Sequence, residues 1–102
     1  KIIRPNSPGQ MLKHYAPKTP LKLNIDKPNL DDAFLDFGNK KATSHQPTLN
    51  LSTSSNLKEA AFNLFYFLRK LDKYSKQRIV VAPIPNIGIG KTINERLKRA
   101  AL

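Results

Sequence analysis

The chain has 102 residues and a formal charge of +11, from 18 Lys and Arg against 7 Asp and Glu. Its length suits one small domain with a modest core, and its hydrophobic content of 39% is that of an ordinary soluble protein. The absence of cysteine excludes disulfides and thiolate metal sites, and the longest apolar stretch, residues 60–68, is too short to span a bilayer. We therefore expect a cytoplasmic protein, and a start at Lys1 rather than Met suggests a segment of a longer one.

The excess of basic residues has two interpretations. Phosphates dominate nucleic-acid affinity, so a basic face is typical of RNA-binding proteins. The positive charges are, however, spread along the whole chain, and most are lysines in a sequence rich in Asn and Ile, a pattern that codon bias also produces. Both interpretations stay open on sequence alone.

Residues 1–20 have the pattern of a tail rather than of a core element. The stretch "SPGQ" predicts a β-turn with Pro8 and Gly9 at its centre, since proline presets φ and glycine tolerates positive φ. Pro17 and Pro20 favour extended backbone in the residues before them. We expect residues 13–20 to form a strap that becomes ordered on contact with another surface.

Three short strands are predicted next. The stretch "LKLNI" at 21–25 alternates apolar and polar residues, as a half-buried strand does. "DDAFLDFG" at 31–38 is an apolar run that fits helix or strand, and we favour strand. After a loop at 38–47, "TLNLS" at 48–52 is the third candidate.

The clearest prediction is a long helix that begins after Asn56, an N-cap residue with Glu59 three positions on. Phe62 and Tyr66 extend its apolar surface to a second side, which predicts that the helix is covered on more than one face. The main apolar stripe recurs at helical spacing and consists of Leu57, Ala61, Leu64, Leu68 and Leu71.

The continuous apolar run "IVVA" at 79–82 predicts a central strand covered on both faces, and a last helix is expected at 91–101. A helical crossover between Leu51 and Ile79 requires at least one parallel strand pair. The sequence therefore predicts an α/β fold. We expect a small Rossmann-like domain at residues 21–102, with a short, at least partly parallel sheet flanked by helices, after a linker at residues 1–20.

The tripeptide "GKT" at 90–92 resembles the end of a phosphate-binding loop, but the rest of that motif is missing. Its first glycine would fall at Pro85, which has no N–H to donate to a phosphate. No later strand remains to supply an acid for magnesium. We expect an ordinary turn whose isoleucines, Ile87 and Ile89, tuck onto the core, and not a nucleotide hydrolase.

Two parts of the chain resemble one family. Ser7-Pro8-Gly9 followed by His14-Tyr15-Ala16-Pro17 is similar to the S-P-G-M-x-x-x-H-Y-A-P linker of the two-domain threonylcarbamoyl-AMP synthases. The stretches "NLS" at 50–52, "LKEAAFNLFYFLRKLD" at 57–72 and "APIPNIGIGKTINERLKRAA" at 82–101 resemble the C-terminal domain that follows this linker. The departures remove no motif residue: they are Gln10 for Met, Ile89 for Leu, Lys91-Thr92 for a small-residue pair, and Glu95 for Asp.

The resemblance implies an enzyme that joins L-threonine, bicarbonate and ATP into threonylcarbamoyl-AMP and pyrophosphate, for the threonylcarbamoyl modification of a tRNA adenosine. It places the catalytic residues, ATP, magnesium, threonine and bicarbonate in an N-terminal YrdC-like domain that precedes Lys1. It implies that this segment is accessory: alone, it is expected to be inactive and to bind no cofactor or metal.

The resemblance also implies that the linker folds over the mouth of the catalytic cleft. It predicts four residues that contact ATP or product: Ser7, Gly9, His14 and Tyr15. It predicts four structural hinges: Pro8, Pro17, Gly88 and Gly90. The alternatives are a packing role for His14 between domains and a tail whose His and Tyr are incidental. Lys13 is expected to be a solvated charge, with a phosphate contact as its alternative.

A second function stays open, a stand-alone basic module that binds RNA directly. It would use the +11 charge. No RNA-binding motif or aromatic platform in the sequence supports it.

Overall fold

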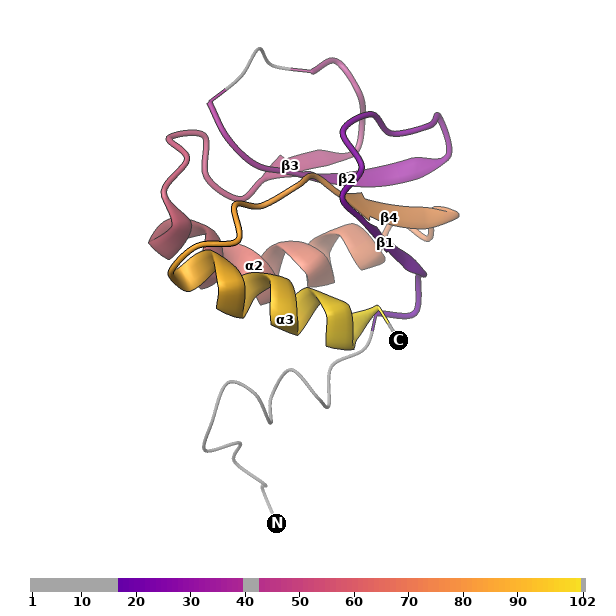
Figure 1. The fold of residues 1–102 in the computed structure, drawn as a ribbon. Helices are drawn as coiled ribbons and strands as arrows, with labels where there is room; N and C mark the ends of the chain where they lie inside the picture. The colour runs from indigo at the N-terminus through magenta and orange to yellow at the C-terminus, as the bar shows by residue number, and fades with distance from the viewer. Residues whose placement is uncertain (1–16, 40–42, 102) are drawn as a thin grey trace.

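The structure, a computed structural model, describes residues 17–39 and 43–101. The predicted α/β class is confirmed: in this part of the chain four strands form an all-parallel sheet, with two helices against one of its faces (Figure 1). The strands are β1 (Leu21–Leu23), β2 (Asp32–Asp36), β3 (Thr48–Asn50) and β4 (Arg78–Val81), and the helices are α2 (Leu57–Asp72) and α3 (Ile89–Ala100). Within these ranges, neither helix has the length and apolar character that a bilayer span requires.

β4 lies inside the sheet, whose order is β1-β4-β2-β3. Because it pairs with β1 on one side and β2 on the other, Ile79, Val80 and Val81 are at most 1% exposed. The prediction of a central strand here is confirmed. The first strand is shorter than predicted, because Asn24 has a φ of 61° and this left-handed conformation ends the extended run.

The predicted start of the long helix is confirmed, although its cap differs from the expected one. The Asn56 side-chain oxygen accepts the Glu59 N–H at 2.9 Å. The Glu59 carboxylate does not return to the cap residue. It accepts the Ser52 hydroxyl at 2.6 Å, and the Ser52 oxygen in turn accepts the Asn56 N–H at 2.9 Å. Three side chains thereby fix the turn that joins β3 to α2.

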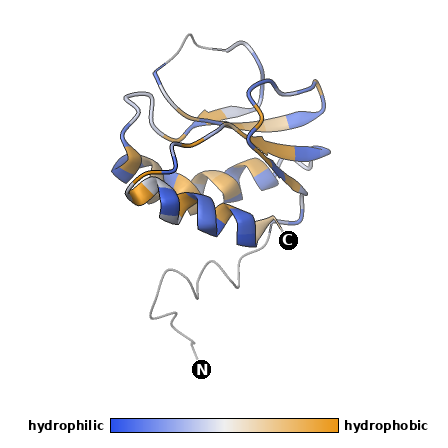
Figure 2. Ribbon diagram, viewed as in Figure 1, coloured by the Kyte–Doolittle hydropathy of each residue, from blue (hydrophilic) through white to orange (hydrophobic). Residues whose placement is uncertain are grey.

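The two faces of the sheet carry cores of different size. The face against α2 and α3 holds the main core, and the apolar sides of both helices turn toward it (Figure 2). The opposite face holds a small cluster of Phe34, Val80 and Ala82, and the connections that follow β1 and β2 lie on this side (Figure 1). The largest fully buried side chains of the main core are Leu35, Leu51, Leu64, Leu68, Leu71, Ile79, Ile93 and Leu97.

His45 covers part of the sheet face that carries the Phe34 cluster. Its ring meets Phe34 edge-on, with centroids 6.5 Å apart, and its Nε2 lies 2.8 Å from the Asp32 carbonyl oxygen. This residue lies in a polar loop, where the sequence predicts no role for it. The structure shows that it packs the loop against the sheet.

An ion pair with a buried carboxylate and a partly exposed arginine fixes the amino end of the central strands. The Asp32 carboxylate is 2% exposed and receives two hydrogen bonds from Arg78, from Nε at 3.0 Å and from Nη2 at 2.8 Å. These bonds hold the pKa of Asp32 below its usual value, and they raise the pKa of Arg78. Because Asp32 and Arg78 are direct neighbours in the β2–β4 register, the pair locks that register.

Candidate functional site

All four sequence-predicted contact residues, Ser7, Gly9, His14 and Tyr15, lie outside the part that the structure describes, and so does the predicted hinge Pro8. Their expected contacts with ATP or product remain predictions. Pro17 is the first described residue and is half-buried.

The end of the predicted linker, residues 17–20, is fastened to the domain at two places, and we call it the linker root. The backbone N–H groups of Lys18 and Thr19 donate to the Asp72 carboxylate at 3.0 and 2.9 Å. The Pro20 carbonyl accepts the Ile79 N–H at 2.8 Å, which extends the β1–β4 ladder toward the linker. Thr19 is only 6% exposed. The last residues of the linker are therefore fixed to α2 and β4.

Asp72 stays charged in this contact. Burial acts to raise its pKa, but hydrogen bonds from Thr19 and Lys18 outweigh burial, and the pKa lies below its usual value. A carboxylate at the last residue of a helix also faces the negative end of the helix dipole, which disfavours it. This unfavourable position makes Asp72 unusual in the sequence, but it does not identify the linker root as the partner of its carboxylate.

Around this contact lies a wide, shallow depression of about 610 Å³. The linker root forms one side of it, and Arg69, Asp72, Lys73 and Lys76 form the other. Basic groups outnumber the single carboxylate here. The linker thus enters the domain across a positively charged surface.

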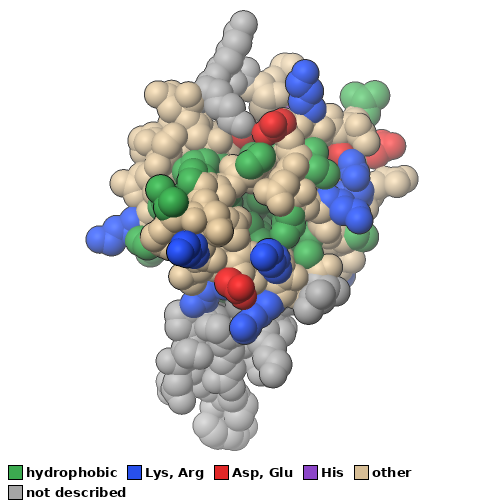
Figure 3. Space-filling view, viewed as in Figure 1, with side chains coloured by type: hydrophobic (Ala, Val, Ile, Leu, Met, Phe, Trp, Pro, Cys, Tyr) green, Lys and Arg blue, Asp and Glu red, His purple; other side chains and the backbone are tan. Residues whose placement is uncertain are grey.

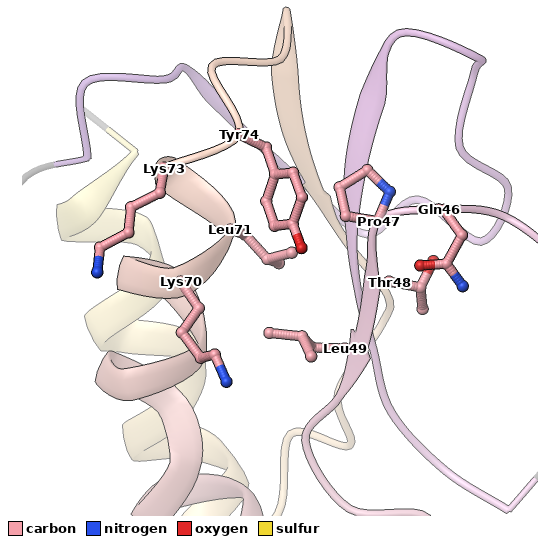
Figure 4. Close-up of a pocket in the computed structure, with 8 residues that line it drawn as sticks. All are labelled: Gln46, Pro47, Thr48, Leu49, Lys70, Leu71, Lys73 and Tyr74. Atoms are coloured by element: carbon pink, nitrogen blue, oxygen red, sulfur yellow. The ribbon is translucent and has the colours of Figure 1, made fainter.

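A pocket of about 370 Å³ lies between the C-terminal end of α2 and the edge strand β3 (Figure 4). Tyr74 faces Pro47 across it, and Leu49 and Leu71 project toward its floor (Figure 4). Lys70 stands at its rim, with its Nζ 5.0 Å from the ring centroid of Tyr66. The residues that line this pocket include no carboxylate and no histidine. Its ionisable side chains are those of Lys70, Lys73 and Tyr74, which can donate hydrogen bonds to a bound ligand.

A groove of about 380 Å³ lies between α2 and α3. Its floor is apolar and consists of Ala61, Leu64, Phe65 and Ile93. Lys58 and Arg96 stand at its rim, and Phe62 borders it with 87% of its surface exposed. The prediction that α2 is covered on a second side is wrong for the described structure, because Phe62 and Tyr66 (59% exposed) are among its most exposed apolar side chains.

The glycine loop before α3 is tightly packed. A Cβ on Gly90 would lie 1.8 Å from the Pro85 carbonyl oxygen, so only glycine fits there. The Gly90 and Lys91 N–H groups donate to the carbonyls of Ile87 and Gly88 at 2.7 and 3.1 Å. These N–H groups are therefore not available to a phosphate, which agrees with the absence of a phosphate-binding loop.

Gly88 has a φ of 50° and begins α3 without a side-chain cap. The hinge role expected of Gly88 and Gly90 remains a prediction. The expectation that the loop isoleucines tuck onto the core is wrong, since Ile87 is 65% and Ile89 43% exposed. Ile84, at 6%, is the isoleucine of this loop that reaches the core, because the chain after β4 continues along the sheet before it turns.

The described residues contain no cluster of three or more His, Asp or Glu side chains that could hold a metal ion. Instead, these residues form a fixed linker root and three open surfaces on or beside α2, which are the depression at the linker root, the α2–β3 pocket and the α2–α3 groove.

A family model for the threonylcarbamoyl-AMP synthase C-terminal domain matches residues 2–102. The chain belongs to this family. No solved structure matches it.

Membership of the threonylcarbamoyl-AMP synthase C-terminal domain family confirms the resemblance drawn from the linker and helix motifs. The match begins at residue 2, so it includes the residues that precede the sheet as well as the sheet itself. The residues that fix the linker root in this family member, Thr19 and Asp72, came from the structure and not from those motifs.

Proposed function

We propose that this chain is the accessory C-terminal domain and lid linker of an ATP-dependent threonylcarbamoyl-AMP synthase. The full enzyme would join L-threonine, bicarbonate and ATP into threonylcarbamoyl-AMP and pyrophosphate, for threonylcarbamoyladenosine in tRNA. A YrdC-like catalytic domain in the same polypeptide would hold the substrates and magnesium. The family match over residues 2–102, linker motif included, carries this proposal.

The linker would act as a lid with one fixed end. An acyl-adenylate hydrolyses unless water is kept away, so closure over the cleft protects the product. In this scheme Tyr15 stacks on or hydrogen-bonds the nucleotide and His14 contacts phosphate, with Ser7 and the Gly9 backbone at the turn. The contact of Asp72 with the linker root supports the scheme, because a lid closes reproducibly only when its base is held in place.

The test uses the intact polypeptide with its catalytic domain and measures threonylcarbamoyl-AMP formation from ATP, L-threonine and bicarbonate. We expect Tyr15→Ala to lower the rate by about tenfold or more, as the loss of a positioning contact does. Leu30→Ala, which removes an exposed apolar side chain from the connection between β1 and β2, is the control and should leave the rate unchanged.

Two results would contradict this proposal. If the intact wild-type protein forms no threonylcarbamoyl-AMP, the assigned reaction is wrong. If it does, but Tyr15→Ala is as active as wild type, the lid role is wrong. Tight tRNA binding that weakens steeply with salt, in a protein without synthase activity, would favour the RNA-binding alternative suggested by the +11 charge.

A further inference from the structure

The outward face of α2 carries a continuous stripe of side chains. Lys58, Phe62, Tyr66 and Arg69 follow one another at helical spacing of three or four residues, on the side opposite the core residues Ala60, Leu64, Leu68 and Leu71. Phe62 and Tyr66 are 87% and 59% exposed. Exposed aromatic side chains that cluster on a rigid element mark a protein interface rather than a solvated surface.

The groove between α2 and α3 adjoins this stripe and makes the surface concave. Its floor is apolar, and the side chains that rise above it are Lys58 and Arg96. Further along α3, Arg96 and Arg99 line a shallow depression beside a single acid, Glu95, and Lys and Arg side chains gather over α3 on the face in Figure 3. An apolar centre with a basic rim is complementary to an apolar patch with an acidic rim.

The position of the linker root indicates which partner lies on this face. The stripe leads along α2 to Arg69 and Asp72, where the linker root is held. Phe62 lies about 15 Å from Asp72 along the helix axis, at a rise of 1.5 Å per residue. The sixteen residues before Pro17 span at most about 55 Å when fully extended, so a domain tethered at the root can reach this face, and the continuity of the stripe with the linker root is what favours it over the other faces.

We propose that the face formed by Lys58, Phe62, Tyr66 and the α2–α3 groove is the docking surface for the catalytic domain of the same polypeptide. This inference rests on the proposed function, which supplies the existence of that domain. The catalytic domain presents an apolar patch bordered by Asp or Glu to this face. Phe62 is the central anchor of the interface, and Lys58 and Arg96 pair with the acidic rim.

The experiment uses the intact polypeptide with a specific protease site inserted between Ile3 and Arg4, so that the linker stays with this domain after cleavage. The dissociation constant between the two halves is then measured for wild type, for a Phe62→Ser/Tyr66→Ser variant and for Leu30→Ser. Leu30 is 89% exposed and lies in the connection between β1 and β2, away from the proposed face, so it controls for the loss of an exposed apolar side chain. We expect the double variant to weaken association at least tenfold and Leu30→Ser to change it less than twofold.

A second measurement does not depend on variants. Hydroxyl-radical footprinting compares oxidation of Phe62 and Tyr66 in the intact protein and in the isolated C-terminal half, with Tyr74 as an internal reference. We expect Phe62 and Tyr66 to be protected severalfold in the intact protein only.

For the variants, unchanged melting temperatures would show that the fold is retained, as expected for exposed positions.

The outcomes separate this inference from the function on which it rests. If the uncut wild-type protein makes threonylcarbamoyl-AMP, but the double variant binds its partner half as tightly as wild type and Phe62 is unprotected, the docking surface is wrong and the function stands. A double variant that instead loses tRNA binding, or self-association of the intact protein, also overturns the docking proposal. Absence of synthase activity in the uncut protein contradicts the proposed function itself.

Discussion

Asp72 and Asp32 each join segments that are far apart in the sequence. Asp72 connects the end of α2 to the linker root, more than fifty residues earlier, through two backbone N–H groups. Asp32 connects the start of β2 to Arg78 at the start of β4. Both carboxylates have a pKa below the usual value, because the folded protein stabilises their charged form.

Replacing Asp72 should release the linker root. We expect Asp72→Ala to lower the free energy of unfolding by about 1–3 kcal/mol, because two donors lose a charged acceptor. Trypsin should also cut faster after Lys18, since that residue is held by the same carboxylate. Asp26→Ala, at an exposed aspartate, is the control. Equal cleavage rates after Lys18 in both variants would show that Asp72 does not hold the root.

Asp32→Asn should change stability in a way that depends on pH. A folded-state pKa below the unfolded value gives a contribution that is complete above about pH 3.9 and is lost as the pH falls through the folded pKa. The variant should therefore be less stable than wild type by about 1–3 kcal/mol at pH 7 and by progressively less toward pH 3. Urea unfolding at several pH values measures the difference, with the exposed Asp31→Asn as control. A difference that stays constant with pH would contradict the ion-pair assignment.

The loop between β4 and α3 depends on backbone geometry and on one amide side chain. The Asn94 Nδ2 of α3 donates to the Ile84 carbonyl at 3.0 Å and to Asn86 Oδ1 at 3.2 Å, which ties the loop back to the helix. Gly90 lies in the first turn of α3 in direct contact with the Pro85 backbone. The loop and the helix therefore behave as one unit.

The two glycines of this element should respond differently to substitution. Gly90→Ala places a methyl group against a backbone carbonyl that cannot turn aside, and we expect a loss of more than about 3 kcal/mol. In Gly88→Ala the new methyl group meets no atom within 4 Å, but the residue must hold a φ of 50°. We expect the free energy of unfolding to fall by about 1–3 kcal/mol. Chemical unfolding of the two single variants shows which substitution lowers the free energy of unfolding more. A larger loss for Gly88→Ala would mean that conformational strain, not contact, limits this position.

At the scale of the whole molecule, the sequence predicted the elements better than their arrangement. Periodic apolar residues and the Asn56 cap were local signals, and they located α2 and the central strand. The crossover through α2 required a parallel pair, but the order β1-β4-β2-β3 depends on pairings between distant segments that no local pattern encodes. The prediction that α2 is buried on a second side failed for the same reason, since a sequence pattern does not say which chain or domain supplies the cover.

The candidate site was predictable only in part. The linker motif pointed to the family because its spacing is specific, and the family match agrees. The anchor of the linker root was not predictable in this way, because a single aspartate at a helix end becomes informative only when its partners are known. His45 is a similar case, since only the folded loop brings it to Phe34.

The central place of β4 also sets the order in which the domain can be completed during synthesis. In the described sheet β1 has no hydrogen-bonded neighbour until β4 is available, and the linker root needs both β4 and the end of α2. A nascent chain that has been synthesised only up to residue 77 lacks β4, so its linker root cannot yet be fully attached. Contacts this distant in sequence form slowly, because the intervening chain must first close into a loop. The linker root, residues 17–20, is therefore among the last parts of the domain to acquire its final position, although it lies at the N-terminal end of the described residues.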